Sequence, residues 1–478
     1  MALARLIVIG GGIAGLAAAH RLTELARERG LGLSLTLLEA RDRLGGTIAT
    51  ERAGGFLIEA GPDSFLTDKP WGLALVERLG LGERLIGTRE GSRRVFVVHR
   101  GRLHPLPEGF LLLAPTRLGP LLRSRLFSWP GKLRMALDLV LPRGRETADE
   151  SLASFVRRRL GREALERVAQ PLVAGIYTAD PESLSLAATM PRFLELERRH
   201  RSLILGLRAE AARRAGAASA SGVRYGLFAS LAGGMGELVE ALAGRLADAV
   251  RLKSPVAGLS RSDRPPRWRI HLADGGTLEA DGVMLATEAH AAARIAADLD
   301  PELARDLAGI PYASSATVTL GYRREAIAHP LDGFGVVVPR SERRPIIACT
   351  FSSLKYPGRA PEGHVLLRAF LGGALQEGML ALDDEALAVT ARAELAALLG
   401  ITGPPELVRV HRHPAAMPQY RVGHLELVAG IEARLARHPG LALAGSAYRG
   451  VGLADTIHSA ETAASHLLLA PGSGHDFH

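Results

Sequence analysis

The chain has 478 residues, 47% hydrophobic and 23% charged, a composition typical of a globular enzyme that excludes a disordered or fibrous protein. Its net charge of +9 suits binding to an anionic membrane or to an anionic small molecule. The sequence contains no helix-turn-helix, zinc-finger or RNA-binding motif, so we expect no nucleic-acid partner. With a single cysteine, Cys349, the chain can form neither an intrachain disulfide nor a cysteine metal cluster. We expect Cys349 to be buried, and we expect the chain to bind no metal.

The first predicted elements are a strand and a helix joined by a glycine-rich turn. Residues 6–9 form a short apolar run that is typical of a buried parallel strand. Gly10, Gly12 and Gly15 follow with the spacing G-x-G-x-x-G, in which the first permits a tight turn and the second lets the backbone approach a pyrophosphate. The third lets the next helix, predicted over 14–29, pack on the strand with its N-terminal N–H groups toward the phosphates.

A second strand, predicted over 33–38, ends at Glu39, at the right distance along the chain to bind a ribose hydroxyl. Arg43 and a glycine doublet at 45–46 follow. An NAD-binding unit does not require a second glycine pair beside the acidic residue that binds the ribose. FAD is longer and needs a second close backbone approach. The pattern resembles the two-glycine flavoproteins, a family that includes amine oxidases, phytoene desaturases and protoporphyrinogen oxidases, and residues 54–65 fit its next flavin-facing segment.

Later segments are predicted to alternate between this nucleotide-binding unit and other parts of the molecule. Apolar runs and glycine-rich loops predict a return to the cofactor at 230–261, 280–292 and 441–468. Residues 300–425 contain alternating runs, such as SSATVTLGY and HVLLRAFLG, that predict an antiparallel sheet. The alanine- and serine-rich segment 211–225 is predicted to be a flexible linker.

Residues 105–215 have helical periodicity and much arginine. Their segment 110–142 contains a single acid, Asp138, and its basic residues lie among leucines and aromatic residues: Arg117, Arg123, Arg125, Lys132 and Arg134. Such a stretch can lie in a membrane interface without spanning the bilayer. A helical subdomain that covers a groove and exposes a solvated arginine face is the alternative interpretation. No run of about 18 apolar residues occurs and the first strand begins almost at once, so we expect neither a spanning helix nor a signal peptide.

Four segments narrow the resemblance to oxygen-dependent protoporphyrinogen oxidases, and with GPDSF they reach from end to end of the chain. They are SLASFVRRRLGREALERVAQPLVAGIYTADPESLSLAATMPRF at 151–193, RRHRSLILG at 198–206, PQYRVGHL at 418–425 and GSAYRGVGLADTIHSA at 445–460. The resemblance implies an α/β fold in three parts. A discontinuous Rossmann-like FAD-binding domain would comprise 1–90, 225–295 and 430–478, a mixed-sheet substrate domain 91–105 and 296–429, and a helical membrane-associating domain 106–224.

The resemblance also implies an activity. Non-covalently bound FAD would oxidise protoporphyrinogen IX to protoporphyrin IX in three two-electron steps of haem biosynthesis, with molecular oxygen as acceptor and hydrogen peroxide as product. Oxidation of coproporphyrinogen III to coproporphyrin III is the nearest alternative; an amine oxidase, a carotenoid desaturase or a non-enzymatic flavoprotein scaffold are others. The expected location is cytoplasmic, peripheral on the inner face of the cell membrane, and the chain could form a homodimer.

The same resemblance assigns the site residues. Arg94 would bind a substrate propionate and the carbonyl of Gly175 would orient the macrocycle, while no side chain is identified as an acid or base. Two residues depart from the family pattern: His413 stands where tryptophan is common, and Ser446 where Asn or Asp is usual. We interpret His413 as a hydrogen-bonded core histidine in preference to a catalytic group. The expected FAD contacts are Gly10, Gly11, Gly12, Ile13, Ala14, Gly15, Glu39, Arg43, Gly46, Thr47, Gly61, Pro62, Asp63, Ser64, Val256, Gly445, Gly450, Val451, Gly452 and Leu453.

Overall fold

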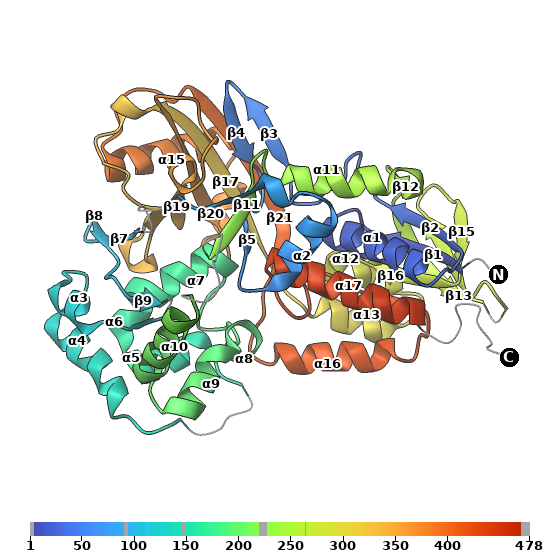
Figure 1. The fold of residues 1–478 in the computed structure, drawn as a ribbon, viewed down its shortest axis with the longest axis horizontal. Helices are drawn as coiled ribbons and strands as arrows, with labels where there is room; N and C mark the ends of the chain where they lie inside the picture. The colour runs from blue at the N-terminus through green and yellow to red at the C-terminus, as the bar shows by residue number, and fades with distance from the viewer. Residues whose placement is uncertain are drawn as a thin grey trace.

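The computed structural model describes residues 4–89, 94–111, 113–144, 149–218, 227–262 and 264–469. Figure 1 shows a nucleotide-binding unit on the right, where both chain ends lie, a large sheet at upper left and a group of helices at lower left. The chain passes between these regions several times. Segments distant in sequence therefore meet in each region.

The nucleotide-binding unit is built on a five-stranded parallel sheet in the order β12-β2-β1-β16-β22. Alternate residues of β1 (Ala4–Ile9) face opposite sides of this sheet, as the two-residue period of a strand requires. Leu6 and Val8 pack with α1 (Ile13–Glu28) and α17 (Leu453–Leu469), whereas Ile7 and Ile9 pack in a second apolar cluster. Both faces of the sheet are thus covered, which explains why β1 reads as a continuous apolar run.

The remaining elements of this unit come from three stretches of the chain, 33–87, 228–308 and 424–443. They are β2 (Leu33–Leu38), β3 (Thr50–Ala53), β4 (Phe56–Glu59), β5 (Phe65–Leu66), α2 (Pro70–Arg78), η1 (Gly82–Arg84), β6 (Leu85–Gly87), β11 (Phe228–Leu231), α11 (Gly236–Arg245), η4 (Ala247–Ala249), β12 (Val250–Arg251), β13 (Val256–Arg261), β14 (Trp268–Leu272), β15 (Thr277–Ala280), β16 (Gly282–Leu285), α12 (Ala289–Ala296), α13 (Pro301–Ala308), α16 (His424–Leu435) and β22 (Leu441–Leu443). The second apolar cluster joins α12, α13 and α16 to β13–β16 around the fully buried Trp268.

The second region is a seven-stranded sheet in the order β21-β17-β20-β19-β18-β7-β8. It is mixed, because β18 pairs parallel with β7 while its other pairings are antiparallel. Val318 and Leu320 of β17 face an apolar cluster with α15, whereas Thr317 and Thr319 are buried on the opposite face. Its elements are β7 (Val95–His99), β8 (Arg102–Pro105), β17 (Tyr312–Arg323), η5 (Arg324–Ala326), β18 (Gly335–Val337), η6 (Arg340–Glu342), β19 (Ala348–Phe351), α14 (Ser352–Lys355), β20 (His364–Gly372), η7 (Glu377–Ala381), α15 (Asp384–Leu399) and β21 (Leu407–Pro418).

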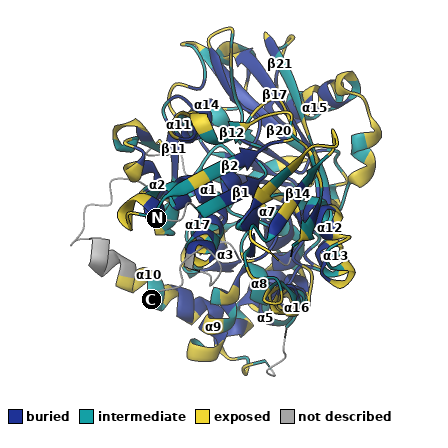
Figure 2. Cartoon of the chain, turned by 90° about the vertical axis from the view of Figure 1, so that its right-hand side faces the viewer, coloured by how far each residue is buried: buried dark blue, intermediate teal, exposed yellow. Residues whose placement is uncertain are grey.

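The described residues of the third region are helical apart from one short hairpin. One apolar cluster packs these helices together and joins them to Val97, Val337 and Ala348 of the large sheet. A π-helical turn, η3, lies between α6 and α7. Figure 2 shows that the outer faces of α9 and α10 are exposed while the strands inside the molecule are buried. The elements are β9 (Phe110–Leu111), β10 (Ala114–Pro115), α3 (Leu118–Arg123), α4 (Trp129–Ala136), η2 (Leu137–Leu139), α5 (Leu152–Leu160), α6 (Arg162–Ala164), η3 (Leu165–Ala169), α7 (Gln170–Tyr177), α8 (Leu186–Thr189), α9 (Pro191–His200) and α10 (Leu203–Ala218).

Several local predictions are confirmed and one is wrong in part. The predicted strand at 33–38 is β2, and Cys349 is buried. The linker predicted over 211–225 is wrong for 211–218, because α10 continues through Ala218; alanine is the strongest helix former and extends the helix there. Residues 219–225 lie outside the described residues. Within the described part of the chain, no helix has the length and apolarity needed to span a bilayer.

Candidate flavin and substrate site

The predicted cofactor residues gather where the parallel strands end. Ile9 of β1 pairs with Leu38 of β2 on one side and with Leu285 of β16 on the other, and Leu285 also pairs with Leu443 of β22. The loops that follow β1, β2 and β22 therefore begin at the same edge of the sheet. Dinucleotides bind outside the carboxyl ends of such strands, and the glycine-rich loops, Glu39 and Gly445 all lie there.

Two close backbone approaches explain the glycines of the first loops. A Cβ on Gly15 would lie 1.8 Å from the Gly10 carbonyl oxygen, so only glycine lets α1 pack so closely on the turn. A Cβ on Gly46 would lie 3.2 Å from the Cα of Gly12, so the two glycine loops face each other through bare backbone. Gly12 and Gly45 also form a short parallel bridge. This cradle fits a pyrophosphate, which needs backbone N–H groups with no side chain between.

The Glu39 carboxylate is fixed at the end of β2 by two hydrogen bonds from the backbone. One carboxylate oxygen accepts a hydrogen bond from the Gly11 N–H at 2.7 Å, and the other accepts one from the Arg41 N–H at 2.7 Å. Its carbonyl oxygen accepts a hydrogen bond from the Ser254 N–H, which brings the start of β13 and Val256 to the same end of the sheet. The carboxylate is 8% exposed beside the first glycine loop, as the ribose assignment requires.

The second glycine loop packs on the segment that follows β4. Arg43 donates a hydrogen bond of 2.7 Å to the Gly46 carbonyl and fixes the doublet. A Cβ on Gly61 would lie 1.9 Å from the Thr47 carbonyl oxygen, so the loop containing Arg43 to Thr47 and the segment Gly61–Ser64 are in direct contact.

The third loop is fixed by Tyr420, a residue of the PQYRVGHL segment with no assigned role in the sequence. Its hydroxyl donates to the Ser446 carbonyl at 2.6 Å and accepts from the Gly450 N–H at 2.7 Å. Ser446 thus takes part through its backbone. The hydroxyl holds the loop of Gly450, Val451 and Gly452 in place before α17 begins at Leu453, and the helix N-terminus carries a partial positive charge suited to an anion.

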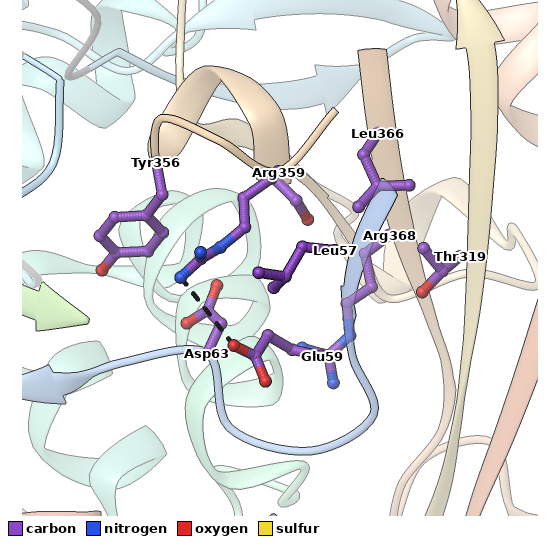
Figure 3. A pocket seen from close by; sticks show the side chains of 9 residues that line it. Leu57, Glu59, Asp63, Thr319, Tyr356, Arg359, Leu366 and Arg368 are labelled. Atoms are coloured by element: carbon purple, nitrogen blue, oxygen red, sulfur yellow. Dashed lines mark ion pairs between the residues drawn. The ribbon is translucent and has the colours of Figure 1, made fainter. Parts of the chain in front are cut away.

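A buried group of charges lies behind Gly61–Ser64 (Figure 3). Asp63 accepts hydrogen bonds of 3.0 Å from Lys355 Nζ at both carboxylate oxygens, and Glu59 pairs with Arg359 at 3.9 Å. Burial alone would raise the pKa of Asp63, but Lys355 and Arg368 outweigh it and lower this pKa to about 2. Burial raises the pKa of Glu59.

The Ala60 carbonyl, one residue before Gly61, receives donors from three strands of the large sheet, the longest contact being the one from Thr317 Oγ1 of β17 at 3.5 Å. Arg368 of β20 donates at 2.9 Å, and His413 Nε2 of β21 lies 2.9 Å from the same oxygen. This contact supports our interpretation of His413 as a hydrogen-bonded core histidine. Burial, and then the charge of Arg368, lower the pKa of His413 to about 4, so its ring is neutral near pH 7.

The two predicted substrate residues lie on neighbouring elements of the large sheet and the helical region. Arg94 precedes β7, is exposed, and donates a hydrogen bond of 2.6 Å to Asp332. Gly175 lies on α7, where a Cβ would come within 4.0 Å of the Ala348 side chain on β19. The contacts of the described residues do not join Arg94 to Gly175 directly.

The sequence analysis did not identify four residues that support the loops of the candidate site: Lys355, Arg359, Arg368 and Tyr420. A usable signal existed for Arg368, because it interrupts the apolar run HVLLRAFLG, where an unpaired charge would be costly to bury. The ion pairs of Lys355 and Arg359 join residues about 300 apart in the chain, and no local pattern marks them.

The fold and the cradle define a flavin-binding oxidoreductase, and comparison with known proteins gives its family. Residues 13–468 match the family described as flavin containing amine oxidoreductase, and the chain belongs to it. It is 37% identical to the coproporphyrinogen III oxidase of Bacillus subtilis over 97% of both chains. It is 34% identical to the protoporphyrinogen oxidase of Bos taurus, over 97% of this chain and 98% of the relative.

A solved structure agrees with this assignment. The crystal structure of a protein from Exiguobacterium sp. 255-15, named as a candidate protoporphyrinogen oxidase, superimposes with a TM-score of 0.84 at 34% identity, covering 97% of this chain and 98% of the other. The chain is therefore a flavin-containing oxidoreductase, and its cofactor is FAD.

Proposed function

We propose that this chain oxidises a porphyrinogen to the corresponding porphyrin by removing six electrons, with molecular oxygen as the final acceptor. The observation that carries the proposal is full-length similarity to porphyrinogen oxidases combined with a complete dinucleotide cradle. Protoporphyrinogen IX is the substrate named first by the sequence resemblance. Coproporphyrinogen III is the second candidate, favoured by the 37% identity to the Bacillus subtilis enzyme.

Different residues of the chain would bind the cofactor and position the substrate. When bound, FAD supplies the chemistry by taking up a hydride in each two-electron step and passing the electrons to oxygen. The glycine loops, Glu39 and the start of α17 would hold the cofactor along the sheet edge, and no covalent link is needed. Cys349 is buried on β19, and burial raises the pKa of its thiol to about 12, so it is a poor nucleophile. Arg94 and Gly175 would position the substrate.

A substrate comparison tests this function. Purified chain, loaded with FAD, is given protoporphyrinogen IX, coproporphyrinogen III, putrescine or phytoene, with porphyrin fluorescence and peroxide measured together. We expect porphyrin from at least one porphyrinogen, with three peroxides per porphyrin because six electrons leave in pairs. The ratio of kcat/KM for the two porphyrinogens assigns the substrate. Peroxide from putrescine, or product from phytoene, with neither porphyrinogen oxidised would reject the proposal.

We also propose that the helical region binds a membrane surface. Large apolar side chains on α4, η2 and the next residues are exposed at a helical spacing: Trp129 (64%), Leu133 (67%), Leu137 (47%) and Val140 (66%). Arg123 and Arg125 are exposed nearby in the chain. An exposed apolar stripe with flanking cations suits an anionic lipid interface. The location that we propose is peripheral, on the inner face of the cell membrane.

The structure limits which basic residues take part in this surface. Lys132 is buried and donates a hydrogen bond of 2.8 Å to the Leu122 carbonyl. Arg134 donates to the carbonyls of Arg157, Arg158 and Arg159. Both cations stabilise the fold, so salt dependence should come from the exposed Arg117, Arg123 and Arg125.

Replacing Leu133 by Asp is expected to lower binding to anionic vesicles at least tenfold, because about 1.5–3 kcal/mol of apolar burial is lost and a charge is added. Raising the salt concentration should weaken wild-type binding, since exposed cations contribute roughly 1 kcal/mol each. Co-sedimentation with phosphatidylserine and phosphatidylcholine vesicles measures both effects. Val389→Asp is the matched control, because Val389 is an exposed valine (54%) on α15. Equal losses in the two variants would contradict the membrane surface.

A further inference from the structure

Arg368 is a buried cation that forms no direct ion pair with any carboxylate of the described residues. It lies on β20, is 5% exposed, and donates one hydrogen bond to the neutral Ala60 carbonyl. Its Nε is buried with no hydrogen-bond partner, and among the described residues no carboxylate is within ion-pairing distance of it. The Phe370 ring centroid lies 4.9 Å from the guanidinium carbon, and Asp63 and Glu59 act on the charge from beyond ion-pairing distance. Burying a guanidinium with no directly paired carboxylate is still costly, because these contacts replace its hydration only in part.

The other charges around Arg368 are already paired. Lys355 pairs with Asp63, and Arg359 pairs with Glu59 while also donating to the Ala232 and Leu231 carbonyls. Three cations thus face two carboxylates, and the surplus positive charge belongs to Arg368. Figure 3 shows Arg368 beside Glu59 and Thr319 at the edge of this group.

The surrounding cavity excludes a substrate group as the missing partner. It measures about 10 Å³, room for one water molecule, which could bridge Nε of Arg368 and the unpaired Oγ1 of Thr319. A propionate would not fit. The other neighbour of the Arg368 guanidinium is the segment Gly61–Ser64. This segment directly follows Ala60, whose carbonyl accepts the hydrogen bond from Arg368.

We propose that Arg368 is a tuning residue for the flavin: its surplus charge, held behind Gly61–Ser64, stabilises the negatively charged two-electron-reduced cofactor over the oxidised one. A fixed cation in a poorly solvated interior acts over several ångströms without direct contact. The inference rests on the proposed function and on the flavin lying against Gly61–Ser64, as the sequence resemblance implies, and is independent of the identity of the substrate.

The test is the midpoint potential of the FAD-loaded full chain, measured by equilibration with a redox dye under anaerobic conditions. Arg368→Met removes the charge at similar length and should lower the ratio of reduced to oxidised flavin about tenfold at a given potential, a shift of about 30 mV to more negative values. Arg368→Lys should recover most of the shift. Arg344→Met is the control, because Arg344 is partly buried but pairs with Glu394 at 2.8 Å.

Asp63→Asn provides a second variant with the opposite sign. It leaves Lys355 without its partner, adds to the surplus charge and should shift the potential to more positive values. A purely structural role of Arg368 would weaken binding of both redox states equally and leave the potential unchanged. Unchanged potentials in Arg368→Met and Asp63→Asn would overturn the inference, whereas a wild-type chain that retains no FAD would reject the proposed function instead. If Arg368→Met does not fold, an unchanged potential in Asp63→Asn is sufficient to reject the tuning role.

Discussion

Replacing Asp138 by alanine is expected to lower the free energy of unfolding by about 3 kcal/mol, because it removes the nearer of the two carboxylates that pair with the buried Arg159 guanidinium and leaves only Glu197, at 3.4 Å. Asp138 and Arg159 are both 0% exposed and are joined by a hydrogen bond of 2.7 Å. The carboxylate also accepts from the Ser202 hydroxyl at 2.6 Å and the Ile204 N–H at 3.0 Å, so it ties η2 to the start of α10. Denaturant unfolding of the FAD-loaded protein measures the loss.

Two further variants separate this effect from an ordinary surface ion pair. Glu182→Ala removes the partner of Arg157, but both side chains are about half exposed, and the expected loss is below about 1 kcal/mol. The double variant Asp138→Leu with Arg159→Met should lose less than Asp138→Ala, because it removes both charges while Glu197 keeps its ion pair with Arg158 at 2.6 Å. A loss below about 1 kcal/mol in Asp138→Ala would show that the pair does not hold the helical region together.

Asp138 also illustrates what the sequence conceals. In the sequence it is the single acid of a basic, leucine-rich stretch, and the same stretch contains Lys132 and Arg134, which resemble its exposed arginines. Only the packing shows that Asp138, Lys132 and Arg134 make internal contacts, while Trp129 and Leu133 are exposed. Composition therefore predicted a helical, basic segment but not which of its charges reach solvent.

The parts predicted well are those fixed by short-range rules. The strand at 33–38 and the run HVLLRAFLG at 364–372 coincide with β2 and β20, because alternation and turn residues are local signals. The glycine motif likewise predicted the close packing of the first helix at Gly15. Arg368 and Ala60 are 308 residues apart, and such a contact depends on how two sheets meet. The group of buried charges next to Gly61–Ser64 could therefore not be predicted from sequence patterns.

Replacing Arg94 by alanine is expected to lower kcat/KM for a porphyrinogen about 30-fold, equivalent to about 2 kcal/mol, while FAD content stays at the wild-type level. Arg94 lies outside the glycine loops, and its guanidinium pairs with Asp332, with side-chain exposures of 60% and 44%. A substrate carboxylate would have to share or replace this partner, so the gain is smaller than for a fully buried pair. Steady-state porphyrin fluorescence and flavin absorbance measure the two quantities.

Asp332→Asn and Arg94→Lys decide whether Arg94 contacts the propionate. If Asp332 competes for the guanidinium, its neutral variant should keep kcat/KM or raise it a few-fold, mainly through a lower KM. Lysine should recover only part of the activity lost in Arg94→Ala, because one ammonium group cannot bind a carboxylate through two parallel hydrogen bonds. If Arg94→Ala retains its flavin and has kcat/KM within threefold of wild type, the propionate assignment is wrong. The next candidate would then be Arg93, which lies outside the described residues.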